Sequence, residues 1–127
     1  MSKFIICTPN APKSIGTYSQ GIRSGNLVFT SGQIPLNPQS GKLISADFKA
    51  EVHQVLNNLD GVLKGGGSSL QCTIKLTVFL IDLSYFVKVN EVFDVFFPED
   101  PPARSAVQVS ALPMSARIEI EAIGFVE

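Results

Sequence analysis

The sequence predicts an α+β domain in which two helices pack on one face of a mixed β-sheet. Three patterns support this fold class. An apolar stripe recurs at helical spacing within residues 48–63, and residues 73–81 are β-branched and almost wholly apolar. Near the C-terminus, residues 103–109 and 116–126 alternate in polarity as strands do. In chain order we expect two strands, a helix, a strand, a helix and two strands.

The N-terminal part predicts a strand and a turn. Residues 26–36, NLVFTSGQIPL, are rich in Val, Phe, Thr and Ile, which favours a strand that is interrupted at Gly32. Residues 37–41, NPQSG, then supply a proline and a glycine, which suit a turn because each favours a particular backbone torsion.

The clearest helix follows this turn. Ser45 or Asp47 can cap its first turn, and the glycines of residues 65–67 end it. Its apolar stripe comprises Phe48, Val52, Val55, Leu56, Leu59, Val62 and Leu63. The opposite, polar face comprises Lys49, Glu51, His53, Gln54, Asn57 and Asp60.

The second half predicts a buried strand followed by a second helix. Residues 73–81 are nearly all apolar after Lys75, which favours a central strand. Asp82 or Ser84 can cap the next helix, which we expect to end before Pro98. Its apolar stripe comprises Phe86, Val89, Phe93, Phe96 and Phe97.

Composition restricts the class of protein. The 127 residues suit one domain, residues 1–127, and the net charge of −1 gives no electrostatic signature of nucleic-acid binding. Only 17% of residues are charged, so we expect part of the surface to be buried in an oligomer. We expect no membrane span and no signal peptide, because the chain lacks a long apolar run and a small-residue cleavage site.

The cysteine and histidine counts exclude two further classes of site. Cys7, Cys72 and His53 are too few for a zinc site or a disulfide framework, and free thiols favour a cytoplasmic protein. Residues 63–69, LKGGGSS, lack the Gly-Lys-Ser/Thr ending of a phosphate-binding loop, and no G-x-S-x-G nucleophile motif occurs. The sequence therefore predicts no zinc site and no phosphate-binding loop.

Arg104 is the first candidate functional residue. It stands at the start of a predicted strand, where it shares a face with Ala106 and Gln108, while Val107 and Val109 share the other. We expect the valine face to meet the core and the arginine face to meet solvent or another subunit. Two interpretations are open: an edge-strand arginine that discourages aggregation, or a planar clamp for a carboxylate.

Asn90 lies inside the apolar stripe of the second predicted helix, between Phe86 and Phe93. A buried amide needs hydrogen-bond partners. Either it ties down a loop carbonyl group, or it orients a binding site.

Two further segments hold candidate residues. The Ser31-Gly32 break inside a strand indicates a bulge or, less commonly, backbone that a ligand approaches closely. Glu119 and Glu121 alternate with the isoleucines of RIEIEAI, so they form either a solvated strand face or a carboxylate that holds a water near Arg104.

Five segments together resemble the RidA/YjgF family, also called reactive intermediate deaminases. They are APKSIGTYSQGI, LVFTSGQIPLNPQSGKL, TVFLIDLSYFVKVNEVF, PPARSAVQV and IEIEAI, in this order along essentially the whole chain. The resemblance implies a chorismate-mutase-like α+β fold, a homotrimer and ligand sites in the clefts between subunits. It implies hydrolysis of 2-imino acids (2-iminobutanoate, 2-iminopropanoate) and their enamine tautomers to 2-keto acids and ammonia, without a cofactor.

The resemblance also implies roles for particular residues. Arg104 would hold the substrate carboxylate, with the backbone around Ser31 and Gly32 nearby. Tyr18 would line the pocket and Asn90 would support it. The first glutamate of IEIE, Glu119, would position the attacking water.

The sequence departs from the family pattern near the site. Ala106 stands where many members have a cysteine, so any role of that thiol is absent. Thr17 stands where proline is usual before the tyrosine, and the loop before Arg104 is shorter than in many members. Two alternatives to an imine hydrolase are a non-catalytic binder of small carboxylates or keto acids and an RNA-cleaving protein, and composition argues against the latter.

Overall fold

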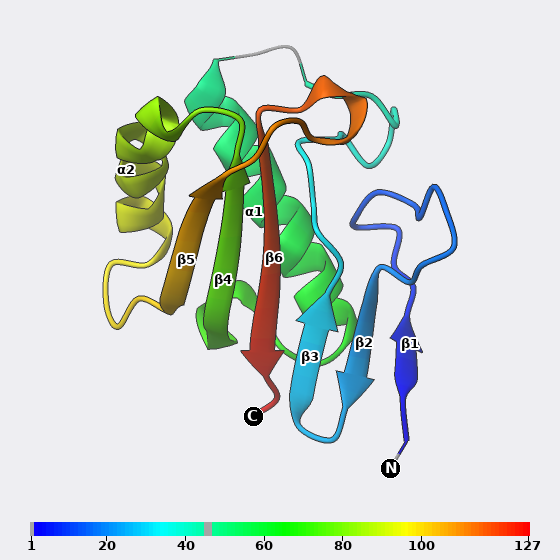
Figure 1. Cartoon of the computed structure of the whole chain (residues 1–127). Helices are drawn as coiled ribbons and strands as arrows, with labels where there is room; N and C mark the ends of the chain where they lie inside the picture. Colours follow the sequence, from blue (N-terminus) through cyan, green and yellow to red (C-terminus); the bar gives the residue numbers. More distant parts are fainter. Residues whose placement is uncertain (1, 45–46) are drawn as a thin grey trace.

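The computed structural model describes residues 2–44 and 47–127, and in these ranges six strands form one sheet accompanied by two α-helices (Figure 1). The strand order is β1-β2-β3-β6-β4-β5, in which only β4 and β5 pair in parallel. The elements are β1 (Phe4–Ile6), β2 (Gly21–Ser24), β3 (Leu27–Thr30), α1 (Phe48–Gly65), β4 (Thr73–Leu80), α2 (Phe86–Phe96), β5 (Ala103–Gln108) and β6 (Ile118–Phe125).

The predicted α+β class is confirmed, with one difference in the number of strands. Three strands precede α1 instead of two, because β1 and β2 are too short, at 3 and 4 residues, to give a clear alternating pattern. Neither α1 nor α2, the helices of the described ranges, is long and apolar enough to cross a membrane.

The start of α1 agrees with the local sequence, but the N-cap of α2 is Tyr85, which makes no capping hydrogen bond, and not the predicted Asp82 or Ser84. The backbone N–H of Ala50 donates to the Asp47 carboxylate at 2.9 Å, so Asp47 caps α1, and Gly66 follows its last residue. Ser45, the alternative cap, lies outside the described residues. Before α2, the Asp82 carboxylate accepts from the N–H of Ser84 at 2.8 Å and caps a short 3₁₀ turn that leads into the helix.

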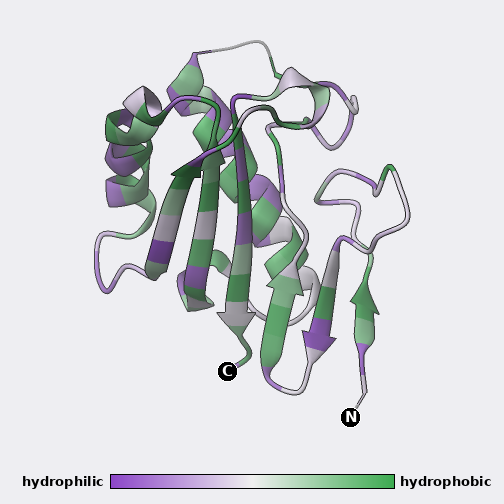
Figure 2. Ribbon diagram, viewed as in Figure 1, coloured by the Kyte–Doolittle hydropathy of each residue, from purple (hydrophilic) through white to green (hydrophobic). Residues whose placement is uncertain are grey.

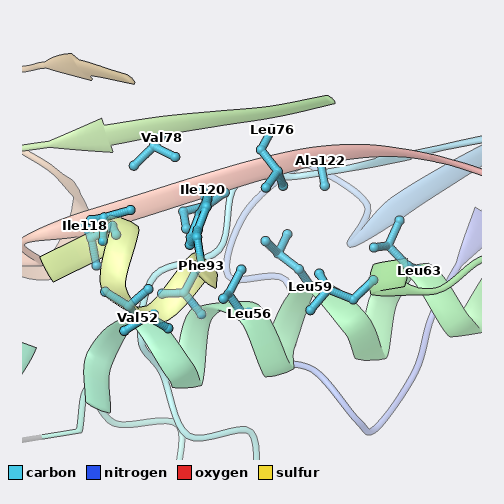
Figure 3. Packing of buried hydrophobic residues seen from close by; sticks show 14 of the residues in the cluster. Val52, Leu56, Leu59, Leu63, Leu76, Val78, Phe93, Ile118, Ile120 and Ala122 are labelled. Atoms are coloured by element: carbon cyan, nitrogen blue, oxygen red, sulfur yellow. The ribbon is translucent and has the colours of Figure 1, made fainter. Parts of the chain in front are cut away.

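The core lies between α1 and the sheet, and α2 closes its β5 end (Figure 3). Figure 3 shows Val52, Leu56, Leu59 and Leu63 of α1 pointing toward β4 and β6, with Phe93 of α2 beside them. The sheet contributes Leu76, Val78, Ile118, Ile120 and Ala122 from alternate positions of β4 and β6. Both helices therefore cover the same face, as predicted.

Within the described ranges no helix covers the other face of the sheet, and this face carries apolar side chains. Figure 2 colours most of β3, β4 and β6 as hydrophobic, although each strand turns only alternate residues toward the helices. On the uncovered face, Leu27, Phe29, Val107 and Phe125 are 38–43% exposed. An apolar patch of this kind is typical of a surface that meets another chain.

The prediction for the two faces of β5 is wrong. Arg104 and Ala106 do share a face, but that face meets the helices: Ala106 packs against the core and Arg104 lies against α2. Val107 instead lies on the uncovered face. Alternation along an edge strand specifies which residues share a face, but α2 decides which face is covered.

Arg117 and Glu51 also differ from expectation. Arg117 lies just before β6 and does not continue its alternation, so its guanidinium turns back toward α1. There it forms an ion pair with Glu51, which is 6% exposed although it belongs to the predicted polar face of the helix. Arg117 also donates to the Tyr85 hydroxyl at 3.3 Å.

Candidate functional site

A pocket of about 340 Å³ lies between α2 and the start of β5. Its lining residues are Asn90, Phe93, Asp94, Phe97, Pro101, Pro102 and Arg104. The helix supplies the aromatic wall, and the two prolines before β5 deliver the arginine to its mouth. Two of the predicted site residues, Asn90 and Arg104, therefore share one pocket.

The Arg104 guanidinium lies against two aromatic rings. Its Cζ atom is 4.9 Å from the ring centroid of Phe86 and 5.3 Å from that of Phe93, within the range of a cation–π contact. Burial lowers the pKa of Arg104, while the Asp94 carboxylate acts weakly in the opposite direction. The group keeps its charge, because an arginine remains protonated throughout the range in which proteins function.

The N–H donors of Arg104 have no acceptor among residues 2–44 and 47–127: the contacts there include no hydrogen bond or ion pair of this side chain. The same holds for the half-buried amide of Asn90 within these ranges. Asn90 therefore does not tie down a loop carbonyl. Both groups instead face the pocket with their hydrogen-bonding capacity unused.

A second and larger pocket, of about 530 Å³, holds the other predicted residues. Tyr18, Ser31, Gly32 and Glu119 all line it. Further lining comes from Pro12, Lys13, Ile15, Gln20, Gln33, Ile34, Leu36, Pro113 and Glu121. The pocket is apolar along most of its wall and acidic at its base.

Glu119 and Gly32 are in direct contact in this pocket. A Cβ atom built on Gly32 would overlap the Glu119 carboxylate, so a larger residue at this position would displace that carboxylate from its place over the backbone. Burial, with a smaller contribution from the neighbouring Glu121, raises the pKa of Glu119. A carboxylate of this kind can accept and return a proton nearer neutral pH than an exposed one.

The predicted Ser31-Gly32 break is a bulge between β3 and β6. Phe29 pairs with Ile123, and the next bridge joins Gln33 to Ile120, so the β3 side advances one residue further than β6. The extra residue moves Gly32 out of the ladder and lets the Glu119 side chain lie over it.

Ser31 and Tyr18 order the wall of the pocket. The Ser31 hydroxyl donates to the carbonyl oxygen of Ser19 at 2.6 Å, and the Tyr18 hydroxyl accepts from the N–H of Ile15 at 3.2 Å. The Ser31 hydroxyl is thus engaged by the backbone, while the Tyr18 ring remains 48% exposed at the pocket rim.

Two buried amides that sequence reasoning missed hold the pocket walls. Gln20 donates to the carbonyl oxygens of Thr8, Ala11 and Pro12, which fixes one wall. Asn58 of α1 donates to the carbonyl oxygens of Ile34 at 3.3 Å and Leu36 at 2.9 Å, which fixes the other. A polar residue among the apolar positions of α1 was the available signal for Asn58.

The two pockets lie on opposite faces of the sheet. Leu76 pairs with both Arg104 and Ala122, so these residues form one row toward the helices. Phe79 pairs with Glu119, in a row of opposite orientation that faces the uncovered side. One chain therefore does not bring Arg104 and Glu119 together.

The described residues include no cluster of three or more histidine, cysteine or acidic side chains that could hold a metal ion. Cys7 is exposed, Cys72 is buried, and neither lines the two pockets. His53 lies on the exposed side of α1, with its ring edge 5.0 Å from Phe96. The polar groups that line the two pockets are carboxylate, guanidinium, amine, amide, hydroxyl and phenol groups.

Sequence comparison finds relatives along the whole chain. A family model described as Endoribonuclease L-PSP matches residues 8–126. The RutC family protein of Pyrococcus horikoshii is 49% identical over 125 residues, covering 98% of this chain and 99% of that protein. The 2-iminobutanoate/2-iminopropanoate deaminase of Escherichia coli is 45% identical over 126 residues, covering 97% of both.

Structure comparison agrees. The structure of the YjgF gene product of Escherichia coli has a TM-score of 0.92 at 41% identity, covering 98% of this chain and 99% of that one. The structure of Escherichia coli TdcF with bound serine also has a TM-score of 0.92, at 42% identity and the same coverage.

Proposed function

This chain belongs to the RidA/YjgF family, and we propose that it hydrolyses 2-imino acids and their enamine tautomers to 2-keto acids and ammonia. The proposed substrates are 2-iminobutanoate and 2-iminopropanoate, which the name of the 45% identical relative specifies. The structure of TdcF with bound serine, a small amino acid, adds support for a ligand of this size.

The main support for the proposal is the environment of the Arg104 side chain. Its guanidinium is partly buried in a pocket and has no acceptor among the residues the structure describes. A planar fork of N–H donors fits the two oxygens of a carboxylate. We assign Arg104 to the substrate carboxylate and the free amide of Asn90 to support of the same ligand.

Glu119 would carry out the proton transfers. In the reaction R–C(=NH₂⁺)–COO⁻ + H₂O → R–CO–COO⁻ + NH₄⁺, the water oxygen bonds to the imine carbon as the C=N electron pair moves to nitrogen. Glu119 accepts one proton from the water and returns it to nitrogen, which becomes –NH₃⁺. As the C–N bond breaks and the C=O bond forms, Glu119 takes the remaining proton of the hydroxyl group, and the departing ammonia takes up this proton and leaves as NH₄⁺. The raised pKa of Glu119 suits both steps.

The iminium carbon is already electrophilic, so orientation of one water beside a held carboxylate supplies most of what the reaction needs. Only water and protons are exchanged, and the proposal includes no cofactor. The two unpaired cysteines support a cytoplasmic location for this activity.

A complete site would form between copies of the chain. Arg104 and Glu119 face opposite sides of the sheet, and the uncovered face carries exposed apolar side chains that could meet a second copy. We propose a homotrimer in which the pocket of Arg104 on one subunit meets the pocket of Glu119 on the next. Light scattering that finds a stable monomer at micromolar concentration would contradict this arrangement.

A coupled assay tests the activity. A PLP-dependent threonine dehydratase generates 2-iminobutanoate, and keto-acid release is followed with this protein, without it, and with Glu119→Gln. We expect accelerated release that Glu119→Gln reduces by about 10²–10⁴-fold, while binding of 2-oxobutanoate persists. Release at the uncatalysed rate with tight 2-oxobutanoate binding would identify a non-catalytic carboxylate binder instead.

The description of the family model also names an endoribonuclease, so RNA is a second candidate ligand. The net charge of −1 does not favour phosphate binding. Filter binding of a single-stranded RNA across a salt titration separates the two: we expect no salt-dependent retention.

A further inference from the structure

We infer that Phe86 and Phe93 are positioning residues that hold the Arg104 guanidinium in its ligand-binding orientation. This inference rests on the proposed role of Arg104 and concerns residues that do not themselves bind the carboxylate. It follows from the arrangement of rings around the cation and from the absence of a protein acceptor for it among the described residues.

Phe86 and Phe93 are seven residues apart on α2, so both rings project from the same side of the helix. That side faces β5, and the Arg104 Cζ atom lies 4.9 Å and 5.3 Å from the two ring centroids. Phe93 is itself fixed, because it is 7% exposed and packs edge-on against Phe97 at 5.6 Å. The guanidinium therefore lies against a rigid aromatic surface.

Aromatic rings suit this task because they attract a cation without using its N–H donors. A protein carboxylate in the same place would also hold the arginine, but it would occupy the donors that a ligand needs. Arg104 has a long side chain with several rotatable bonds, and no hydrogen bond or ion pair with the described residues restrains its end. The rings therefore reduce the ordering that a carboxylate ligand must impose on binding.

Asn90 lies between the two phenylalanines on the same side of α2 and lines the same pocket. One helix face thus supplies ring, amide and ring in succession. A shift of α2 would move all three relative to Arg104, so the helix couples the orientation of the clamp to the packing of the core through Val89, Val92 and Phe93.

The test measures the dissociation constant of 2-oxobutanoate by calorimetry, together with kcat and KM for 2-iminobutanoate. We expect Phe86→Leu and Phe93→Leu each to weaken 2-oxobutanoate binding about three- to tenfold, with KM raised more than kcat is lowered. Phe86→Tyr keeps the ring, so it should bind 2-oxobutanoate as tightly as the wild type. Phe96→Leu is the matched control, because Phe96 lies on α2 but contacts His53.

A double-mutant cycle separates positioning from general packing. In the Arg104→Ala background, Phe86→Leu should produce no further loss of 2-oxobutanoate binding, because the rings act only through the arginine. In the intact protein, the Hε resonance of Arg104 should show an upfield ring-current shift that Phe86→Leu reduces and Phe96→Leu does not.

The outcomes distinguish this inference from the proposed function. Wild-type binding by Arg104→Ala overturns the carboxylate clamp and with it the inference. The inference alone is overturned if Arg104→Ala loses 2-oxobutanoate binding while Phe86→Leu and Phe93→Leu bind as tightly as Phe96→Leu. If Phe93→Leu does not fold, Phe86→Leu alone tests the inference, because Phe86 is only half-buried. A further loss of 2-oxobutanoate binding when Phe86→Leu is added to Arg104→Ala contradicts the inference.

Discussion

Arg104 and Arg117 each lie against two aromatic rings, but they differ in their ion-pair and hydrogen-bond partners. The Cζ atom of Arg117 lies 5.4 Å from the ring centroids of both Phe48 and Tyr85, and Arg104 lies at 4.9 Å and 5.3 Å from its own two rings. Arg117 is paired with the buried Glu51 carboxylate and donates to the Tyr85 hydroxyl. Arg104 has no such acceptor among the described residues.

The comparison distinguishes the groups that hold an arginine side chain in place from the groups that accept hydrogen bonds from its N–H donors. Rings can hold a guanidinium at both places, but only at Arg117 does a carboxylate use its donors, which joins α1 to the start of β6. Because the Asp94 carboxylate that lines the same pocket forms no ion pair with it, Arg104 remains a charged fork in a partly buried pocket, which is costly for stability and useful for binding an anion. We therefore predict that the two arginines respond oppositely to substitution.

The largest effect is expected for Arg104→Ala. Two charge-assisted hydrogen bonds to the ligand, each worth about 1.5–3 kcal/mol, correspond to a loss on the order of 10²-fold or more in kcat/KM. Arg104→Lys keeps the charge but not the planar fork, so it should recover part of this loss. The melting temperature should change by less than about 3 °C.

The assay is 2-iminobutanoate hydrolysis beside thermal unfolding and light scattering of both Arg104 variants. Unchanged kcat/KM in Arg104→Ala would return this residue to the role of an edge-strand charge. A collapse of the assembly would mean that Arg104 pairs with a carboxylate of another copy.

Arg117→Ala should show the reverse behaviour. It leaves the Glu51 carboxylate buried without its partner, and a third of the Arg117 side chain is exposed, so we expect a loss of about 2–3 kcal/mol in the free energy of unfolding. Thermal unfolding measures this, with Arg117→Ala/Glu51→Ala as the matched double variant. The double variant should be more stable than Arg117→Ala, and equal stability of the two would contradict the ion-pair explanation.

A carboxylate placed beside Arg104 should make it resemble Arg117. Asn90→Asp adds one to the pocket, at a position that lines it together with Arg104. We expect KM for 2-iminobutanoate to rise about tenfold, since a protein carboxylate now competes with the ligand for charge-assisted hydrogen bonds. Asn90→Ala is the control, and equal KM values for the two variants would mean that the new carboxylate does not reach Arg104.

The two glutamates, Glu51 and Glu119, also differ in their surroundings, and this difference predicts how stability depends on pH. Glu51 has a cationic partner, whereas burial and then Glu121 raise the pKa of Glu119 above its ordinary value of 4.5. A raised pKa in the folded state means that folding binds protons, so stability falls as pH rises from 4.5 through that raised value.

Glu119→Gln, which imitates the protonated form, should therefore melt at a higher temperature than the wild type at pH 7. The difference should shrink as pH falls below 4.5, where the wild-type carboxyl is protonated in both states. Thermal unfolding between pH 3 and pH 8 measures it, with Glu99→Gln, at an exposed position outside this pocket, as the control. A difference that is constant with pH would rule out the titration of Glu119 as its cause.

The smallest effect is expected for the thiols. Cys7 is exposed and should react readily with iodoacetamide, and buried Cys72, whose Sγ atom lies 3.3 Å from Glu127, should react slowly. Ala106 occupies the position where many family members carry a cysteine, so alkylation should leave 2-iminobutanoate hydrolysis unchanged. Loss of turnover by an alkylated but folded protein would place a thiol in the site.

Much of the fold could be predicted because its signals are local. Asp47 caps α1 as expected, the apolar stripe of residues 48–63 forms the buried side of α1, and Ile118 and Ile120 face the core. Asp82 caps the 3₁₀ turn that precedes α2 and not the helix itself. β1 and β2 gave weaker signals because strands of 3 and 4 residues offer too few alternations to recognise.

The candidate site was predicted residue by residue but not as an arrangement. Patterns along the chain indicated Arg104, Asn90, Ser31, Gly32 and Glu119 as candidates, and the resemblance to the family supplied their roles and added Tyr18. It did not indicate that they fall into two pockets on opposite faces of the sheet. Gln20 and Asn58 were missed because their partners are carbonyl oxygens, which every residue carries and no sequence pattern distinguishes.

The sequence by itself determined which residues share a helix side or a strand face, since both periods are set by the local backbone. Only the tertiary structure decided which face each one meets. α2 covers the side of β5 that carries Arg104, and the bulge after β3 brings Gly32 beneath Glu119. Both contacts join segments far apart in the chain, and the packing of whole elements against each other fixes them, which no local period records.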